Sequence, residues 1–304
     1  MHYQYTFLLR PATWDAARKP ASLKPSSLAV LGLGAIGGSL AWQARVAGVP
    51  RVIGFSPERS EGIQALKASA ITDLADTAAR AVRGADLVVL AVPPKPTLDL
   101  ISALAPILES GALLTDVCSI KVPVLKEATA AGIADRFVGG HPLAGTHESG
   151  FGSARPDRLL GCVVYICETA TPGGSRAADI VAEFWEHTLG ASAIRIGADH
   201  HDRQLAWTSH LPQAIAYALA ESLAEHGQPG VSYGSGAKDT TRLAASNPEM
   251  WLDILLYNEP AVGEALELTQ ARLSELRRLL AAGDRVGLRS YLTRAQAFRK
   301  GIDR

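Results

Sequence analysis

The chain has 304 residues, of which 47% are hydrophobic and 20% charged. This length suits one large or two ordinary domains, and the composition excludes disorder over most of the chain. Its 30 basic and 30 acidic side chains give a net charge of zero, which argues against a general nucleic-acid binder. No apolar run is long enough to span a membrane. The cysteines, Cys118, Cys162 and Cys167, have no CxxC spacing, so we expect no disulfide framework, no metal site and a cytoplasmic location.

Residues 1–27 differ in character from the rest of the chain. They are basic and poor in acidic residues, and Pro11, Pro20 and Pro25 interrupt them. An organelle transit peptide has a similar composition, whereas the apolar piece YTFLL is too short for the hydrophobic region of a secretory signal. We favour the simpler interpretation, which is a loose N-terminal extension.

Short apolar runs alternate with helix-like segments from residue 28 to residue 197. The runs are SLAVLGLG, RVIGFS, ADLVVLAVP, GALLTDVCS, RFVGG, CVVYIC and SAIRIG. Continuous apolar runs that alternate with helices indicate βαβ units and a parallel sheet buried on both faces. The pattern therefore predicts an α/β domain with a doubly wound sheet of the Rossmann type over residues 28–197.

The strand signal disappears after Gly197. Residues 199–226 have the pattern of one long helix that carries Pro212, and further helices are expected over 249–257, 261–282 and 285–300. Positions 262, 266, 269, 273, 276 and 280 form a coiled-coil-like stripe, interrupted by Thr269. We therefore expect an all-helical domain over residues 198–304, and a homodimer formed through it.

A glycine motif follows the first apolar run. Gly32, Gly34 and Gly37 form G-x-G-x-x-G, with Ile36 inside the motif, and the pattern lies between an expected strand and an expected helix. In that context the glycines permit a tight turn and a close approach of a dinucleotide pyrophosphate to the helix N-terminus. The motif therefore predicts a dinucleotide cofactor bound at Gly32, Gly34, Ile36 and Gly37.

The end of the second apolar run bears on the choice of cofactor. An NAD site usually has an acidic residue there, which binds the adenine ribose. This chain has Ser56 instead, and Arg59 follows shortly after. Glu58 is an alternative acid, although it lies past Pro57 at the expected start of the next helix. We therefore expect Ser56 and Arg59 to contact the cofactor, with NADP preferred over NAD.

The chain also carries polar residues at two other expected strand ends. His141 and His147 lie in a glycine-rich loop after an expected strand, and Ser119 follows another strand end. Open α/β sheets bind ligands at this edge, where an imidazole can take a proton. Ser119 is also a good candidate for a plain helix cap.

At these residues the chain resembles a known family. The segments GLGAIGGS, DVCSIK, GGHPLAGTHESG, HDRQLAWTSHLPQ and KDTTRLAASNPEMWLDI are similar to those of prephenate/arogenate dehydrogenases, the oxidative enzymes of tyrosine biosynthesis. The resemblance covers nearly all of residues 28–300. It implies a Rossmann domain, a helical dimerisation domain and a substrate cleft between them. A cyclohexadienol substrate would lose a hydride to the nicotinamide and then CO2, and its ring would become aromatic.

The resemblance also implies roles for individual residues. His141 matches the histidine that takes the proton of the C4 hydroxyl group, and Ser119 matches a serine that contacts the same hydroxyl. Arg242 matches the arginine that holds the ring carboxylate, a task that suits a guanidinium. Three more residues match positions near the substrate but are equally compatible with capping or packing: Asp202, His210 and Trp251.

Two positions depart from the family pattern. Gln213 stands where familiar prephenate enzymes have a histidine, near the substrate side chain, so either prephenate or arogenate is compatible with it. His147 stands where some relatives have a glutamate. Near Arg242, Lys238 and Asp239 are available for ion pairs.

Two other functions remain as alternatives. A 3-hydroxyacid dehydrogenase has a similar architecture but needs a catalytic lysine in a helix of its C-terminal domain, and Lys238 is the only lysine between residues 127 and 299. A non-catalytic dinucleotide-sensing protein would need neither His141 nor Ser119. The expected partners are a small-molecule substrate and a second copy of the chain, with no nucleic acid and no membrane.

Overall fold

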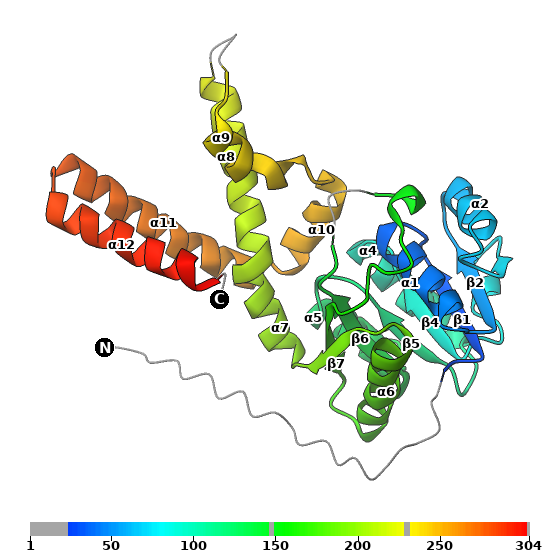
Figure 1. Ribbon diagram of the computed structural model, residues 1–304. Coiled ribbons are helices and arrows are strands. Elements are labelled where there is room, and N and C mark those ends of the chain that lie inside the picture. Colours follow the sequence, from blue (N-terminus) through cyan, green and yellow to red (C-terminus); the bar gives the residue numbers. More distant parts are fainter. Residues whose placement is uncertain (1–23, 146–148, 228–231, 303–304) are drawn as a thin grey trace.

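The computed structural model describes residues 24–145, 149–227 and 232–302. Within these residues one sheet has the strand order β3-β2-β1-β4-β5-β6-β7-β8, and a helical region follows it (Figure 1). The α/β fold class predicted from the sequence is thereby confirmed. The strands are β1 (Ser27–Leu31), β2 (Arg51–Phe55), β3 (Asp73–Leu74), β4 (Leu87–Leu90), β5 (Leu113–Asp116), β6 (Phe137–Pro142), β7 (Val163–Glu168) and β8 (Ser192–Arg195).

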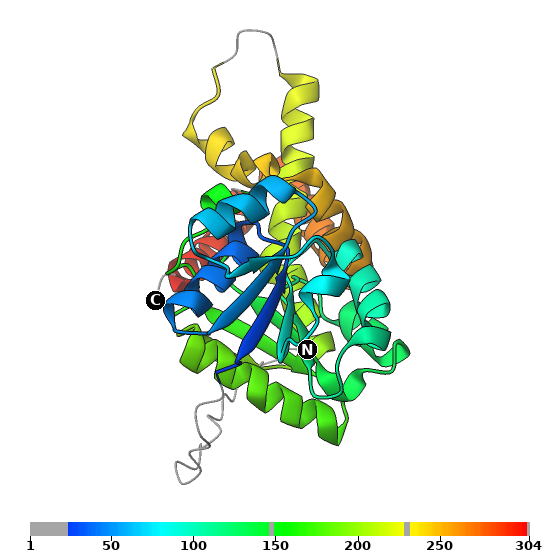
Figure 2. The same cartoon turned by 90° about the vertical axis from the view of Figure 1, so that its right-hand side faces the viewer.

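Helices cover both faces of the sheet (Figure 2). One buried cluster joins the sheet to α1 (Ala35–Val46), α2 (Arg59–Lys67) and α6 (Pro172–Glu183). The other joins it to α3 (Ala78–Ala81), α4 (Pro94–Leu104) and α5 (Val122–Ala130). Because both faces are buried, the strands are continuously apolar, which is the pattern that the sequence shows.

One strand pair departs from the parallel sheet that the sequence predicts. β6 pairs antiparallel with β7, whereas the other neighbouring pairs are parallel. In the described part of the connection between them, the one helical piece is the short turn η3 (Phe151–Ser153). A parallel crossover normally needs a full helix, so a chain without one returns in the opposite direction.

The helix expected over residues 199–226 is interrupted. α7 (Ala198–Leu205) passes through a π-turn, η5 (Ala206–His210), into α8 (Leu211–His226). Pro212 lacks the amide hydrogen that an unbroken α-helix needs, and the π-turn ends just before it. The helical pieces that follow α8 among the described residues are α9 (Ser235–Thr241), η6 (Arg242–Ala245), α10 (Pro248–Tyr257), α11 (Glu259–Ala281) and α12 (Arg285–Ile302).

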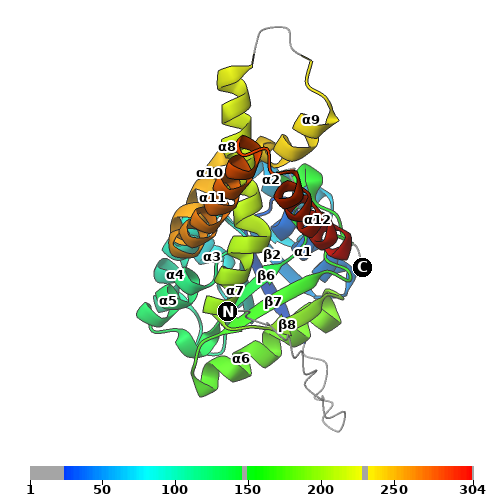
Figure 3. The ribbon, with the colours of Figure 1, turned by 90° about the vertical axis from the view of Figure 1, so that its left-hand side faces the viewer.

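The helices α11 and α12 lie side by side and extend away from the sheet (Figures 1 and 3). Along the predicted stripe Val262 is buried, but Leu266, Leu273 and Leu280 are 38%, 56% and 59% exposed. A single chain therefore leaves most of this apolar stripe uncovered. Within the described residues, no helix is both long enough and apolar enough to cross a membrane.

Candidate active site

The glycine loop between β1 and α1 requires glycine at two positions. Gly32 has a positive φ of 99°, and a Cβ atom there would lie 2.2 Å from the carbonyl oxygen of Ala91. A Cβ atom on Gly37 would lie 2.0 Å from the carbonyl oxygen of Gly32. Neither position tolerates a side chain, so the backbone packs β1, β4 and α1 tightly together.

The same loop leaves a helix N-terminus suited to an anion. Gly34 is the N-cap of α1, no side chain in the described part of the chain caps the helix, and its first turn has no acidic residue. Among the described residues, a Cβ atom on Gly34 would find only the amide nitrogen of Gly150, at 4.0 Å. Ile36 is half-buried in the first turn. The bare backbone and the positive end of the helix dipole fit the pyrophosphate of a dinucleotide.

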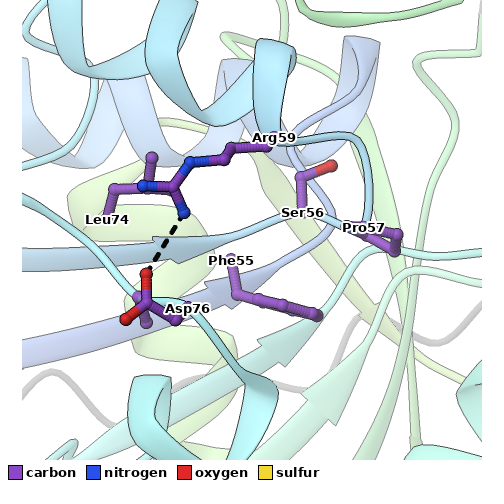
Figure 4. A pocket seen from close by; sticks show the side chains of 7 residues that line it. Phe55, Ser56, Pro57, Arg59, Leu74 and Asp76 are labelled. Carbon is purple, nitrogen blue, oxygen red and sulfur yellow. Dashed lines mark hydrogen bonds and ion pairs between the residues drawn. The ribbon is translucent and has the colours of Figure 1, made fainter.

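Ser56 and Arg59 line one pocket beside this loop (Figure 4). Its volume is about 340 Å³, and Arg59 Nη1 lies 3.2 Å from Asp76 Oδ1 across it. Arg80 contacts the other oxygen of Asp76 at 3.1 Å. The structure thus brings Ser56 and Arg59 together as the sequence suggested, and adds a carboxylate that already holds the arginine. The pocket residues are Phe55, Ser56, Pro57, Arg59, Leu74, Ala75 and Asp76.

A carboxylate that the sequence analysis missed lies next to Ser56. The hydroxyl of Ser56 donates to Glu61 Oε2 at 2.8 Å, and Ser56 is buried. Glu61 Oε1 faces Gly150, 3.5 Å from where a Cβ atom would stand. The sequence motif places the ribose-binding acid at the end of the second strand, whereas this one comes from the first turn of α2. The feature of the sequence that could have indicated Glu61 is its position five residues after Ser56, in the first turn of the helix that follows β2.

His141 lies inside β6 and not in the loop after it, which corrects the sequence prediction. Its ring is buried, and Nδ1 lies 2.9 Å from Nε2 of His201. Burial lowers the pKa of His141 well below its usual range, and the positive charge of Lys121, like that of His201 or His210 when either is protonated, lowers it further. A neutral imidazole results, which is the form that accepts a proton. His147 lies outside the described residues.

Asp202 connects the helical region to the sheet region. Its Oδ1 accepts from the amide of Lys121 and its Oδ2 from the amide of Val122, both at 2.8 Å. These are the first amides of α5, so Asp202 acts as a cap supplied by another helix. Its Oδ1 also lies 2.7 Å from Nδ1 of His201. The capping role that the sequence left open is therefore present, and a contact of Asp202 with substrate stays a prediction.

A second buried pair joins β5 to β6 beside His141. The ammonium of Lys121 bonds to the carboxylate of Asp116, and it also donates to the carbonyl oxygen of Gly140 at 2.7 Å. Asp116 Oδ1 accepts from the amide of Gly140 at 3.1 Å. Asp116 and Lys121 lie in the segment DVCSIK, and the sequence by itself predicts no role for either residue. Their contacts hold the strand position just before His141 in place.

His210 and Trp251 carry buried nitrogen atoms without partners among the described residues, namely Nε2 and Nε1. Their rings meet edge to face, with centroids 6.0 Å apart. The amide nitrogen of Asn258 lies 3.0 Å from Nδ1 of His210, so that Nδ1 accepts and the hydrogen of the neutral ring is on Nε2. Burial lowers the pKa of His210 to about 4, which keeps it neutral. The N–H groups of His210 and Trp251 are therefore two buried donors without an acceptor among the described residues. A carboxylate is an acceptor that suits them.

Ser119 lies between two residues that pack against the helical region. Cys118 and Ile120 are buried and form a small cluster with Ile254 of α10. Ser119 itself is half-buried and makes no hydrogen bond to the described residues. Burial raises the pKa of the Cys118 thiol to about 12, so this cysteine is not a nucleophile. The hydroxyl of Ser119 is thus held at the junction of the two regions.

Arg242 is not brought into contact with the histidines within one chain. It begins η6, is exposed, and forms no ion pair or hydrogen bond with the described residues. Lys238 and Asp239 on α9 are exposed as well. Gln213 is buried, and its amide donates to the carbonyl oxygen of Leu243 at 2.7 Å. Gln213 therefore fixes α8 to the turn that carries Arg242. The described residues contain no cluster of His, Cys, Asp or Glu suited to a metal ion.

Comparisons with known proteins agree with this geometry. Residues 40–194 match the nucleotide-binding domain of prephenate dehydrogenase, and residues 197–294 match its dimerisation domain. The cyclohexadienyl dehydrogenase of Zymomonas mobilis is 34% identical over 287 residues, which span 90% of this chain and 95% of that protein. The prephenate dehydrogenase of Bacillus subtilis is 31% identical, over 91% of this chain and 76% of that protein.

Solved structures give the same answer. A prephenate dehydrogenase from A. aeolicus, in complex with hydroxyphenyl propionate and NAD+, superposes with a TM-score of 0.84 at 28% identity, over 91% of this chain and 98% of that one. The arogenate dehydrogenase of Synechocystis superposes with a TM-score of 0.74 at 26% identity, over 91% of this chain and 99% of that one. The two family matches together span most of the sequence, and so the chain belongs to the prephenate dehydrogenase family.

Proposed function

We propose that the chain catalyses the oxidative decarboxylation of prephenate, arogenate or both, with hydride transfer to NAD(P), in tyrosine biosynthesis. Family membership over both regions supports this activity. The observation in the structure that supports it most is His141, a buried neutral imidazole on the sheet that also carries the glycine loop. A protein that only senses dinucleotides needs no such base.

The proposed chemistry divides among a few side chains. Bound NAD(P) supplies the hydride acceptor. His141 takes the proton of the C4 hydroxyl group, and Ser119 donates to or accepts from the same oxygen. The N–H groups of His210 and Trp251 donate to the ring carboxylate, together with Arg242. Holding this carboxylate keeps it aligned for loss as CO2 when the ring becomes aromatic.

Turnover of candidate substrates tests the activity. The purified protein is incubated with prephenate or arogenate and with NAD or NADP, and the absorbance of the reduced nicotinamide is followed. We expect reduction of the cofactor together with release of CO2 for at least one substrate. No turnover with any of the four combinations would reject the proposal.

We extend the proposal to NADP as the preferred cofactor. Ser56 leaves the end of β2 without a carboxylate, and Arg59 and Arg80 both contact Asp76, so two guanidinium groups share one carboxylate beside the pocket. A 2′-phosphate there would gain a charge-assisted contact. Glu61 opposes this preference, because its carboxylate repels a phosphate and can accept from a ribose diol. We therefore expect a modest preference, about tenfold.

We also propose that arogenate is accepted. Gln213 replaces a histidine that, when protonated, would attract a pyruvyl carboxylate and repel an ammonium group. The amide of Gln213 is neutral and donates to the carbonyl oxygen of Leu243, so it brings no charge toward the substrate side chain. Strict dependence on prephenate, without arogenate turnover at millimolar substrate, would contradict this part.

A homodimer through the helical region completes the proposal. The exposed leucines of α11 support it, as does the match to a dimerisation domain. Sedimentation is expected to give a dimer for the unmodified protein and a monomer for Leu273→Asp. Leu160→Asp, which changes a leucine of the sheet domain that is 67% exposed, serves as a control that stays dimeric. A monomeric unmodified protein at micromolar concentration would exclude the dimer.

The alternative of a 3-hydroxyacid dehydrogenase gains no support. It requires a catalytic lysine in the helical region, and Lys238 is exposed on the short helix α9. Within the described residues, the Lys238 side chain makes no contact with His141 or the glycine loop. For location we propose the cytoplasm, because Cys118, Cys162 and Cys167 are all free thiols.

A further inference from the structure

Two histidines and a carboxylate form a continuous hydrogen-bonded chain behind the proposed base. His141 Nδ1 lies 2.9 Å from His201 Nε2, and His201 Nδ1 lies 2.7 Å from Asp202 Oδ1. All three residues are buried, and His201 has no exposed surface at all. His141 belongs to β6 and the other two to α7, so the hydrogen bond between the two histidines crosses from the sheet to the helical region.

The direction of each hydrogen bond follows from the carboxylate end. A carboxylate only accepts, so Nδ1 of His201 carries a hydrogen. Burial lowers the pKa of His201, so its ring is neutral and Nε2 has a lone pair. Nδ1 of His141 therefore donates to Nε2 of His201. In neutral His141 the lone pair is then on Nε2, the nitrogen that a base needs free.

We propose that His201 is a positioning residue for His141, one that selects the tautomer with an unprotonated Nε2 and stabilises the imidazolium through Asp202. The inference rests on the proposed function only for the identity of His141 as the base. In the reaction the proton of the substrate hydroxyl goes to Nε2 of His141. The hydrogen on Nδ1 stays in its bond to His201, so no further reactant is required.

The surroundings of His201 hold its ring in one orientation. The ring of Tyr165 on β7 meets it edge to face, with centroids 5.5 Å apart, and Gln204 donates to the hydroxyl of Tyr165 at 2.6 Å. The charged and titratable groups around His201 come from β5, β6, β7, α7, η5 and the loop before α5, and Lys121 is already paired with Asp116. Asp202 thus supplies the negative charge next to the ring. These groups are His141, Tyr165, Asp116, Lys121, Asp202 and His210.

Nitrogen NMR of histidine-labelled protein tests the tautomer directly. We expect His141, assigned through its loss in His141→Asn, to carry its hydrogen on Nδ1. In His201→Phe the hydrogen should move to Nε2 in a large share of molecules, because the acceptor is gone. His200→Phe is the matched control, since His200 is the exposed neighbour on the same helix, and it should leave the signal of His141 unchanged. An Nε2 hydrogen in the unmodified protein, or no change in His201→Phe, would overturn the inference.

The pH profile of kcat tests the effect on catalysis. For His201→Phe we expect kcat to fall about tenfold or more, with the KM of the substrate within about twofold. The acidic limb of the profile should move to lower pH, because the imidazolium of His141 has lost its acceptor. A residue that only fills space would lower kcat without moving this limb, and that outcome would refute the role.

A second variant keeps the test valid if His201→Phe does not fold. His201→Gln places an amide oxygen where it can accept from His141 but breaks the link to Asp202. We expect the tautomer of His141 to be retained while the acidic limb still moves. An unmoved limb in this variant would also refute the role. If His141→Asn itself keeps a normal kcat, the proposed function loses its base, although the tautomer result can still stand.

Discussion

The edge of the sheet at which we propose that cofactor and substrate bind has two ends, which are built in opposite ways. At the cofactor end, Arg59 and Asp76 form an ion pair with side chains 69% and 57% exposed. At the other end, His141, His201 and Asp202 are buried and take their partners from different strands and helices. Exposed pairs are screened and exchange partners with water, whereas buried hydrogen bonds fix geometry and protonation. Changes at the buried end should therefore have the larger effects.

The largest effect is expected for His141→Asn. The variant loses the proton acceptor but keeps a polar side chain of similar size, so kcat should fall by about 10²–10⁴-fold with little change in substrate KM. Steady-state kinetics with prephenate or arogenate measures both values. His187→Asn, which changes an exposed histidine, is a control that should leave them unchanged. A near-normal kcat in His141→Asn would show that the buried end does not supply the base.

The next effect concerns stability at acidic pH. The pKa of His210 is about 4 in the folded protein, because the ring is buried, whereas an unfolded histidine has a pKa of about 6.5. The unfolded state therefore binds a proton first, and stability falls as the pH drops below 6.5 toward 4. At pH 5 this one group should lower the free energy of unfolding by about 2 kcal/mol.

Denaturant unfolding of the unmodified protein and His210→Gln at neutral pH and at pH 5 measures this loss. The variant has no group that titrates at this position, so its stability should fall less on acidification. His226→Gln, at an exposed histidine, should behave like the unmodified protein. Equal losses for all three proteins would mean that His210 is charged in the folded state.

A smaller effect is expected for Arg242→Gln, because this residue is exposed in a single chain. It removes a carboxylate contact that is present in both ground and transition states, so KM should rise about tenfold while kcat changes little. Steady-state kinetics gives both values, and Arg203→Gln, on α7, is a control for a lost arginine charge. An unchanged KM would show that Arg242 does not bind the carboxylate, and His210 and Trp251 would be the remaining donors.

The smallest effect is expected at the cofactor end. Arg59→Ala should lower kcat/KM for NADP about tenfold or less and leave NAD almost unchanged, since an exposed guanidinium contributes little. Glu61→Gln should shift the preference toward NADP, because it removes a charge that repels a phosphate. Competition between the two cofactors in both variants measures the ratio. If neither variant changes the ratio of NADP to NAD use, Arg59 and Glu61 do not select the cofactor.

Much of the fold could be predicted from short stretches of sequence. Apolar runs such as LVVL and helices such as α11 have local periodicity, and Gly32 and Gly37 stand where a backbone without side chains is required. The sequence pattern placed His141 in a loop, because a strand that contains two glycines and ends in a proline resembles a loop. The same pattern predicted a parallel sheet and did not show that β7 is antiparallel to β6. The direction of β7 depends on the length and content of its connection to β6, which strand periodicity does not reveal.

By itself the sequence determined the fold class, the family and the residue types available for the reaction, because periodicity and motif spacing are properties of neighbouring residues. Only the tertiary structure decided which of these residues meet. His141 and His201 are 60 positions apart, and Lys121 and Asp202 are 81 apart. Hydrogen bonds over such separations follow no local pattern. The protonation of the histidines likewise depends on burial, which arises only when the sheet and the helices pack together.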